Sequence, residues 1–379
     1  MEREIFVKTL NPNYIETEIE TIGFDHSYKH HAIKKNQFKT IKIFNLRPQE
    51  ASILKQTALS LGFDAAVNRG VLDCSVQYSD AILTASITQF EKLTLALTKQ
   101  PFKMKTVSEL IKNLIFAQPT ALQIKNINFD WSRTYLMGIL NITPDSFSDG
   151  GMYNSQEKAV KHFISLYEDG ADIIDIGAES TRPNHTQITP EEEIKRLKPI
   201  LDEIQALNLE IPISIDTRNV KTAEFAINNG ANLINDVGFD DFNYEMIEFV
   251  NQNKIPYILT HNKKIQTHSA DEIFRDFTFI MNKITSPLIL DIGIGFGKTP
   301  DENYELISRA KEFKSLNKPV MVGHSRKSFL SKTFGFTNKE LDEATIAISS
   351  KLILDKIDIL RVHDIKKHKQ LLNVLSKLN

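Results

Sequence analysis

The sequence has little of several features that define whole classes of protein. It contains one cysteine, Cys74, in 379 residues, which excludes an intramolecular disulfide framework and a cysteine-rich zinc module. No segment approaches the ~18 consecutive apolar residues needed to cross a membrane. The start of the chain is of mixed charge and lacks the apolar core of a signal peptide. With 46 basic against 48 acidic residues, no strong field favours a polyanion. These absences predict a cytoplasmic globular protein with neither a membrane nor a nucleic-acid partner.

From about residue 136 onward, short apolar runs alternate with longer amphipathic stretches. The runs are continuous in hydrophobicity, as in strands buried on both faces of a parallel sheet. They are Leu136–Ile142, Asp172–Gly177, Ile211–Thr217, Leu233–Val237, Pro256–His261, Leu288–Ile292, Pro319–Gly323 and Ile359–Val362. Eight such strand–helix units over roughly 240 residues fit an α/β fold of the (β/α)8 TIM-barrel type, whose usual size is about 250 residues. A doubly wound open sheet is the competing architecture.

The first third of the chain follows a different pattern. It predicts a smaller α/β domain at residues 1–130, before a barrel at residues 131–379. The predicted strands are Ile41–Leu46, Ala65–Asn68, Cys74–Tyr78 and Ile82–Ala85. The predicted helices are Pro48–Leu61, a second helix with Ile87, Phe90, Leu93 and Leu97 on one face, and Val107–Ala117. An oligomerisation or docking role is our hypothesis for this part.

Seven of the eight predicted barrel strands end in polar or charged residues. Because the active site of a TIM barrel lies at the carboxyl ends of its strands, these side chains are expected to converge on one mouth. They include Asn141, Asp175, Asp216, Asn235, Asp291, Lys327 and Arg361. One polar strand end has little meaning, since every strand ends in something polar, but seven at one mouth indicate a functional site.

The residue types indicate what binds there. Asp216, Asn235 and Asp291 are short acceptors and donors that suit a planar heterocycle, such as a base or a pterin. The cationic donors suited to phosphate are Arg182, Lys327, Arg361 and His363. Asn141 offers an oxygen to a hard cation such as Mg2+, which keeps waters and bridges substrate phosphates. The sequence therefore predicts a heterocyclic substrate that carries phosphate.

Two long motifs resemble the signatures of dihydropteroate synthases. They are NITPDSFSDGG at residues 141–151 and GADIIDIGAESTRP at residues 170–183. Shorter motifs follow in the order of that family, namely Ser214–Thr217, Ile234–Asp236, Gly293–Lys298, Ser325–Ser328 and Arg361–Asp364. The resemblance covers the chain from about Thr134 to its C-terminus.

The resemblance implies a transferase of folate biosynthesis. Such an enzyme joins 6-hydroxymethyl-7,8-dihydropterin pyrophosphate to p-aminobenzoate, and it releases pyrophosphate and 7,8-dihydropteroate. The resemblance also implies Mg2+ as a cofactor, held by Asn141 together with the pyrophosphate, and a homodimer. The physical chemistry agrees, since pyrophosphate leaves best when a metal ion and fixed cations neutralise its growing charge. The electron-poor pterin methylene left behind would be stabilised by Asp216 and Asp291, and no protein nucleophile is needed.

The same resemblance implies a role for each matching residue. The pterin would be bound by Asp216, Asn235, Asp291, Lys327 and Arg361. The pyrophosphate would be bound by Asn141, Thr181, Arg182, Arg361 and His363. The p-aminobenzoate would be bound by Phe147, Asp149, Thr181, Arg182, Pro183, Phe296, Ser325 and Lys327. The catalytic set would be Asn141, Asp216, Asp291, Lys327, Arg361 and His363.

Some residues near these motifs have a structural interpretation. Asp175 is as well explained as a buried hydrogen-bond acceptor as by a site role, and His324 is predicted to be structural. Lys298 suggests a phosphate-binding loop, but the first glycine of that motif would fall at Ile292. The chain departs from the family at Asn184 and His185, where a glycine and a small residue are usual, and at Ile292, where proline is usual.

Two other functions remain open at this point. A methyltetrahydrofolate:corrinoid methyltransferase shares the pterin-binding barrel, but it would not need the anion site at Ser325–Lys327 or the loop after Asn141. A binding or regulatory module that has lost catalysis is the alternative from another class. A fusion with a pyrophosphokinase is not expected, because residues 1–130 lack its signature.

Overall fold

The computed structural model describes residues 5–142, 152–179, 188–239, 244–263 and 269–378. The chain forms two compact units, Met1–Ala117 and Gln118–Asn379. The sequence predicts a boundary after residue 130, and the structure has it after Ala117. The hairpin of β4 (Leu122–Ile124) and β5 (Ile127–Phe129) belongs to the second unit.

The second unit is a closed parallel barrel, as the sequence predicts. Its strands are β6 (Tyr135–Asn141), β7 (Ile173–Gly177), β8 (Ile213–Asp216), β9 (Leu233–Asp236), β10 (Tyr257–Thr260), β11 (Leu288–Asp291), β12 (Val320–Val322) and β13 (Ile359–Val362). Each strand pairs with the next along the chain, and β13 pairs with β6 to close the ring. The competing open sheet is therefore wrong, since an open sheet leaves two edges unpaired.

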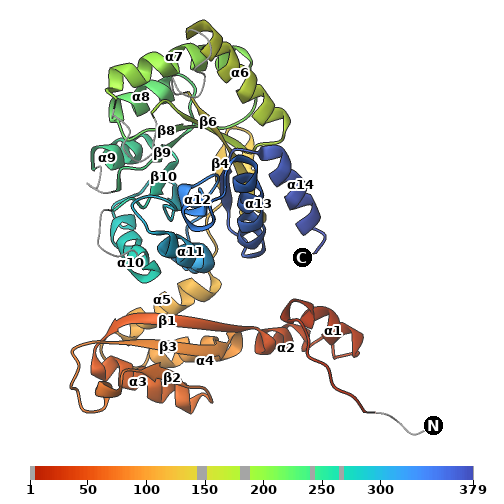
Figure 1. Cartoon of the computed structure of the whole chain (residues 1–379). Coiled ribbons are helices and arrows are strands. Elements are labelled where there is room, and N and C mark those ends of the chain that lie inside the picture. Colours follow the sequence, from red (N-terminus) through yellow and green to blue (C-terminus); the bar gives the residue numbers. More distant parts are fainter. Residues whose placement is uncertain (1–4, 143–151, 180–187, 240–243, 264–268, 379) are drawn as a thin grey trace. The chain divides into compact units, whose positions relative to one another are not determined.

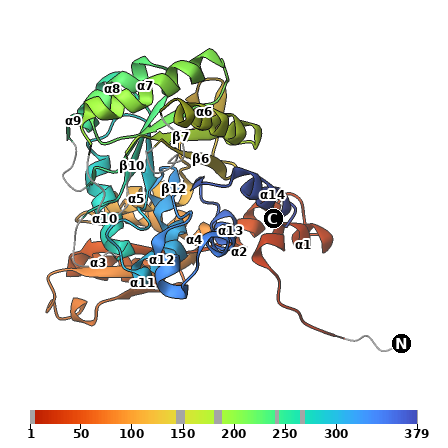
Figure 2. The same cartoon turned by 45° about the horizontal axis from the view of Figure 1, so that its top comes forward.

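Helices surround the strands of the barrel (Figures 1 and 2). They are α6 (Met152–Glu168), α7 (Pro190–Ala206), α8 (Val220–Asn228), α9 (Tyr244–Asn253), α10 (Ala270–Met281), α11 (Pro300–Arg309), α12 (Ser328–Phe334), α13 (Asn338–Leu354) and α14 (Ile365–Leu375), with a 3-10 helix at Ala310–Leu316. Their apolar stripes face the sheet. In α6, for example, Ala159, Phe163 and Leu166 are buried in the barrel core, at the spacing of one helical face.

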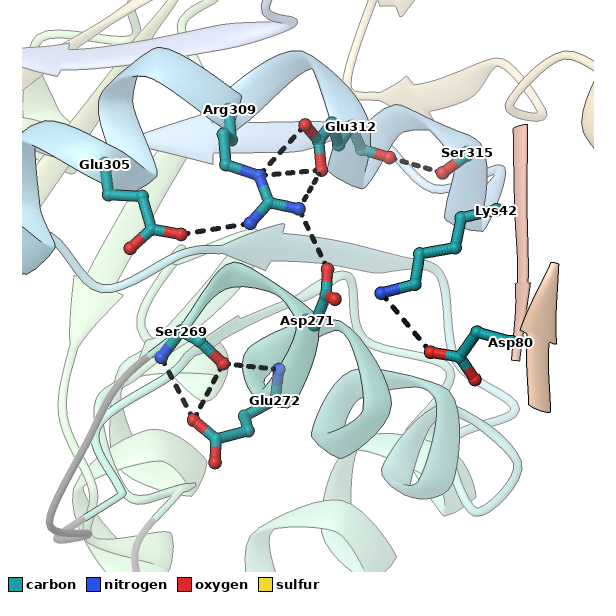
Figure 3. Close-up of polar contacts among 9 residues, drawn as sticks. All are labelled: Lys42, Asp80, Ser269, Asp271, Glu272, Glu305, Arg309, Glu312 and Ser315. Atoms are coloured by element: carbon teal, nitrogen blue, oxygen red, sulfur yellow. Dashed lines mark hydrogen bonds and ion pairs between the residues drawn. The ribbon is translucent and has the colours of Figure 1, made fainter. Parts of the chain in front are cut away.

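Polar caps and ion pairs set the bounds and packing of these helices. The α10 helix starts at a capping box in which Ser269 and Glu272 exchange hydrogen bonds, and this satisfies amides that the helix leaves unpaired. Arg309, the last residue of α11, reaches Glu305, Glu312 and also Asp271 on α10, at 2.8 Å (Figure 3). Arg309 therefore links two neighbouring outer helices.

The barrel floor is covered by the short hairpin of β4 and β5. Phe129, Leu122 and Ile124 are buried in one cluster with inward-facing residues of the barrel strands, including Tyr135 and Met137. Burying about three large apolar side chains there stabilises the unit by several kcal/mol, at roughly 1.5–3 kcal/mol each. The mouth at the opposite ends of the strands is left for polar residues.

The first unit is a small α/β domain, as predicted. An antiparallel sheet has the order β1 (Phe38–Leu46), β3 (Ser79–Ser86), β2 (Ala65–Val67). Its core cluster combines strand residues with α3 (Pro48–Ser60), α4 (Ile87–Leu97) and α5 (Met104–Phe116). Lys42 and Asp80 form a cross-strand ion pair on the sheet at 3.4 Å (Figure 3). Further elements are the 3-10 helices Pro12–Tyr14 and Arg69–Val71, with α1 (Ile15–Thr21) and α2 (Lys29–Asn36).

One predicted strand of this unit is wrong. Cys74–Tyr78 is irregular, and Cys74 has a positive φ of 57°. The Ser75 amide donates to the carbonyl of Gly70 at 3.0 Å and to the Asp73 side chain at 3.1 Å. These local hydrogen bonds compete with strand pairing. The helices α1 and α2 were not predicted.

In the part of the chain that the structure describes, no helix combines the length and hydrophobicity needed to cross a membrane.

Candidate active site

Three short polar side chains lie near the carboxyl ends of barrel strands, two of which, β8 and β9, are neighbours. Asp216 ends β8, Asn235 lies in β9, and Asp291 ends β11. All three are at most 9% exposed. A buried carboxylate or amide is costly unless it is hydrogen-bonded, so their partners define how this site works.

Arg361 is the central cation of the mouth. Its Nε lies 2.6 Å from Asp175 Oδ2, and its Nη2 lies 2.8 Å from Asp216 Oδ2. Asn235 Nδ2 also donates to Asp175 Oδ2, at 3.0 Å. Asp175 therefore holds both Arg361 and Asn235. The sequence alone leaves open whether Asp175 is a buried acceptor or part of the site. The available signal was a carboxylate inside the apolar run of β7, since a buried charge requires a partner.

Several buried polar atoms at this mouth have no partner among the described residues. They are Asn235 Oδ1, Asp175 Oδ1 and Ser214 Oγ. Since buried polar atoms are paired in more than ~90% of cases, such a group of exceptions in one place is a feature to be explained. Buried acceptors without a partner suit a ligand that brings its own N–H donors, as the edge of a pterin or a base does.

Two glycines leave room for the remaining site residues to lie close to the backbone and to one another. A Cβ on Gly323 would lie 3.6 Å from Asp291 Oδ2 and 3.8 Å from Arg361 Cβ, which places Asp291 beside Arg361. A Cβ on Gly295 would lie 2.9 Å from the Lys327 side chain. Lys327 in turn has its Nζ 4.4 Å from the centre of the Phe296 ring, a cation–π geometry.

Asn141 joins the same group. It is the last residue of β6, it is exposed, and its Oδ1 lies 3.4 Å from the position of a Cβ on Gly177. That same position is 3.5 Å from Asp216 Cβ, so Asn141 and Asp216 flank one glycine. The structure thus brings together Asn141, Asp216, Asn235, Asp291, Lys327 and Arg361, as the sequence predicts.

Burial raises the pKa values of the two aspartates of this cluster and lowers that of its lysine. It raises the pKa of Asp216 to about 7, although Arg361 opposes the shift, and it raises the pKa of Asp291. It lowers the pKa of Lys327 to about 8, with repulsion from Arg361 as a further cause. Perturbed pKa values of both signs in one cluster are typical of a functional site.

His363 differs from the prediction in its charge. The sequence predicts a cationic donor at this position, but burial and the nearby cations Arg326 and Arg361 lower the pKa of His363 to about 3. It is therefore neutral near pH 7. Its Nδ1 lies 2.9 Å from Ser325 Oγ. If the serine hydroxyl donates to Nδ1, Nε2 carries the proton and can donate a hydrogen bond to an anion.

The described residues of the mouth offer few ligands to a metal ion. Among the residues with a described position, no group of three or more His, Cys, Asp or Glu side chains could hold an ion. The carboxamide oxygen of Asn141 is one hard ligand. A single protein oxygen fits Mg2+, which retains waters and takes its other ligands from substrate phosphates.

Some predicted site residues lie outside the described residues. They are Phe147, Asp149, Thr181, Arg182 and Pro183. Asn184 and His185, where the chain departs from the family, also lie outside the described residues. Within the described part, His324 is structural as predicted, since it is fully buried with its Nε2 2.7 Å from Ser349 Oγ. Lys298 serves no phosphate loop. Its Nζ donates to the carbonyls of His261, Gly293 and Phe296.

A closed (β/α)8 barrel with buried acids, an amide and two cations at its mouth is the architecture of a TIM-barrel enzyme. Residues 137–363 match the family model described as pterin binding enzyme. A dihydropteroate synthase from Clostridium beijerinckii is 41% identical over 242 residues, which cover 62% of this chain and 90% of the relative.

Two further similarities extend this result. A Helicobacter pylori protein named as a bifunctional dihydropteroate synthase/dihydropteroate reductase is 31% identical and matches 99% of both chains. The structure of Xanthomonas albilineans dihydropteroate synthase with 4-aminobenzoic acid has a TM-score of 0.64 at 31% identity, covering 68% of this chain and 98% of that one. The chain belongs to the pterin-binding enzyme family, and within it to the dihydropteroate synthases, the transferases of folate biosynthesis.

Proposed function

We propose that the cluster around Arg361 is where this chain joins a dihydropterin pyrophosphate to p-aminobenzoate. The supporting observation is the set of buried acceptors at the mouth, Asp216, Asp291 and the unpartnered Asn235 Oδ1. A dihydropterin edge presents N–H donors that would satisfy these atoms, so binding would remove the cost of leaving them unpaired.

The reaction is a displacement at the pterin methylene carbon. The carbon–oxygen bond breaks, and its electron pair leaves with the pyrophosphate. The amine nitrogen of p-aminobenzoate forms the new bond and then loses a proton. Lys327 and Arg361 stabilise the negative charge that accumulates on the leaving group, and neutral His363 donates a hydrogen bond to it.

Mg2+ fits this proposal as a cofactor at the leaving group. Asn141 would supply one oxygen ligand, and the ion, when bound, would neutralise pyrophosphate charge. Replacing Asn141 by Ala is expected to raise the Mg2+ concentration for half-maximal rate by about tenfold, since losing an oriented ligand costs about 1.4 kcal/mol. A rate that is independent of Mg2+ in the unchanged protein would contradict the metal assignment.

The central experiment measures pyrophosphate release by the full chain. Release is expected only when the pterin pyrophosphate and p-aminobenzoate are both present, and Lys327→Ala or Arg361→Ala should lower kcat/KM by about a hundredfold or more. Unchanged turnover in either variant would contradict the proposal. Binding of methyltetrahydrofolate without binding of the pterin pyrophosphate would favour the methyltransferase instead. Tight binding without product would favour a module that has lost catalysis.

A second candidate activity is reduction of dihydropteroate. The observation that favours it is the similarity to the bifunctional Helicobacter pylori protein, which runs through both units of this chain. The step would transfer a hydride from a reduced nicotinamide or flavin to the carbon of the dihydropterin C=N bond, with a proton to the nitrogen. Oxidation of the donor that depends on dihydropteroate would support it. No oxidation above the rate without protein would exclude it.

The homodimer and the cytoplasmic location remain predictions. Sedimentation of the full chain tests the dimer directly, since a monomer has the mass of 43.2 kDa. Comparing the mass and activity of the full chain with those of residues 134–379 tests the hypothesis that the first unit serves oligomerisation or docking. Equal mass and activity would contradict that hypothesis.

A further inference from the structure

A chain of buried polar side chains lies behind the ends of β12 and β13. Ser349, on α13, has its Oγ 2.7 Å from His324 Nε2 and 2.8 Å from His368 Nε2. His368, on α14, has its Nδ1 2.6 Å from the carbonyl oxygen of Asp364. The three side chains are at most 1% exposed. A single serine hydroxyl thus connects a strand end to two helices.

The proton positions in this chain follow from its partners. The Asp364 carbonyl only accepts, so His368 carries its proton on Nδ1, and burial lowers the pKa of His368. Its Nε2 is then a lone pair that needs a donor, which the Ser349 hydroxyl supplies. Ser349 Oγ in turn accepts from His324 Nε2–H. The Thr345 carbonyl, 2.9 Å from Ser349 Oγ, is the second acceptor within reach of the serine hydroxyl.

Both ends of the chain adjoin the two turns that carry the anion-binding residues. His324 lies in the turn after β12 that leads to Lys327, and Asp364 directly follows His363 in the turn after β13. Nearer the mouth, Ser325 Oγ and His363 Nδ1 form a second link at 2.9 Å. Two sets of hydrogen bonds therefore connect the two turns. One is the direct Ser325–His363 contact, and the other, which runs from His324 to Asp364, passes through Ser349.

We propose that Ser349 is a positioning residue, which fixes the turn after β12 against the turn after β13 so that Lys327 and His363 face the same pyrophosphate group. This inference rests on the proposed function, because it requires pyrophosphate to bind at these turns. Binding groups must be held within about 0.5 Å by the residues behind them. A series of hydrogen bonds in which each group donates to the next supplies such support without adding a charge to the core.

Ser349→Ala tests the proposal, with Ser350→Ala as the matched control. Ser350 is the next residue of α13, and its Oγ donates to the Ile346 carbonyl within the same helix, at 2.9 Å. The measurement is calorimetric binding to the full chain, with Mg2+, of the pterin pyrophosphate and of 6-hydroxymethyl-7,8-dihydropterin. Ser349→Ala is expected to weaken binding of the pyrophosphate ester by about tenfold and of the alcohol by less than about twofold. Ser350→Ala should change neither.

The outcomes separate this proposal from the proposed function. Equal effects of Ser349→Ala on the two ligands, or no effect on either, would overturn the positioning role alone. Failure of the unchanged protein to bind the pyrophosphate ester would overturn the proposed function as well.

Nitrogen NMR of the histidines in the unchanged protein provides a test that does not depend on folding of the Ser349 variant. His368 is expected as the neutral Nδ1–H tautomer and His324 as the neutral Nε2–H tautomer. Their signals are assigned by their loss in His368→Gln and His324→Gln. A proton on His368 Nε2 in place of Nδ1 would show that Ser349 donates elsewhere, and it would overturn the proposal.

Discussion

Arg361 and Asp175 form a buried ion pair across the barrel mouth, with Arg361 Nε 2.6 Å from Asp175 Oδ2. Their strands, β13 and β7, are not neighbours, because β6 lies between them. The arginine side chain is 13% exposed and the aspartate is fully buried. The same carboxylate oxygen accepts from Asn235. One buried acid therefore sets the positions of a cation and an amide of the site.

Replacing Asp175 by Asn should weaken catalysis and stability together. Arg361 loses the carboxylate that its Nε contacts, while Asp216 and the nearby charge of Asp291 remain, and breaking a buried pair costs about 3 kcal/mol. We expect a loss of about a hundredfold in kcat/KM for the pterin pyrophosphate, measured by pyrophosphate release, and a lower free energy of unfolding in urea. Asp172→Asn is the control. Asp172, whose side chain is 12% exposed, pairs at 2.6 Å with Arg133 and accepts from the Leu136 amide at 2.8 Å, so we expect lower stability but unchanged kcat/KM.

The rate should depend on pH through two groups of the mouth. Below about pH 7, Asp216 gains a proton, because its pKa is raised to about 7, and it ceases to be a pure acceptor for pterin donors. Above about pH 8, Lys327 loses its charge, because its pKa is lowered to about 8. A plot of kcat/KM against pH should therefore be bell-shaped, with apparent pKa values that belong to the coupled cluster. Asp216→Asn should remove the acid limb and keep the alkaline one. An acid limb that persists in this variant would assign it to another group.

The barrel was predictable because its signals are local. Each strand of a parallel barrel is a short apolar run bounded by a turn, and eight runs at regular spacing leave few other folds. The strands of the first unit were harder to predict, because local hydrogen bonds decide where they begin and end. Cys74–Tyr78 has the composition of a strand, yet the Ser75 amide pairs with Gly70 and Asp73. The hairpin Leu122–Phe129 carries no sign in the sequence of which unit it packs against.

The meeting of the described polar residues at the barrel mouth was predictable, but the partners of each residue were not. Asp216, Asn235 and Asp291 follow apolar runs in the sequence, and barrel topology then requires that they meet. That Asp175 pairs with Arg361 is a contact between residues 186 positions apart, which no spacing reveals. The neutral state of His363 is likewise a consequence of burial beside Arg326 and Arg361, and burial of a strand end is decided by packing.

Lys298→Met should disturb the loop after β11. The Lys298 ammonium donates to the carbonyls of His261, Gly293 and Phe296 at 3.1, 2.8 and 3.2 Å. Its loss removes three hydrogen bonds, at about 1 kcal/mol or more each, although the Gly293 carbonyl keeps the Phe296 amide at 3.3 Å. We expect a fall of about 3 kcal/mol in the free energy of unfolding and a higher KM for p-aminobenzoate, since Phe296 is a predicted contact. Lys332→Met, at an exposed position of α12, should change neither. Equal stability of the two variants would contradict a role for Lys298 in this loop.

Gly293 and Gly297 offer a paired test of how closely the loop after β11 approaches its neighbours. Both have a positive φ, of 70° and 63°, so alanine at either position costs about 1–2 kcal/mol in backbone strain. A Cβ on Gly293 would lie 1.9 Å from the His261 carbonyl oxygen, whereas a Cβ on Gly297 would meet nothing within 4 Å. Gly293→Ala should therefore displace the backbone beside Asp291, whose Oδ1 accepts from the Gly293 amide at 2.9 Å. We expect it to weaken pterin binding by about tenfold or more and to lower the unfolding free energy well beyond the loss in Gly297→Ala. Equal losses in the two variants, measured by urea denaturation and calorimetry, would show that strain alone limits this loop and that contact with His261 does not position Asp291.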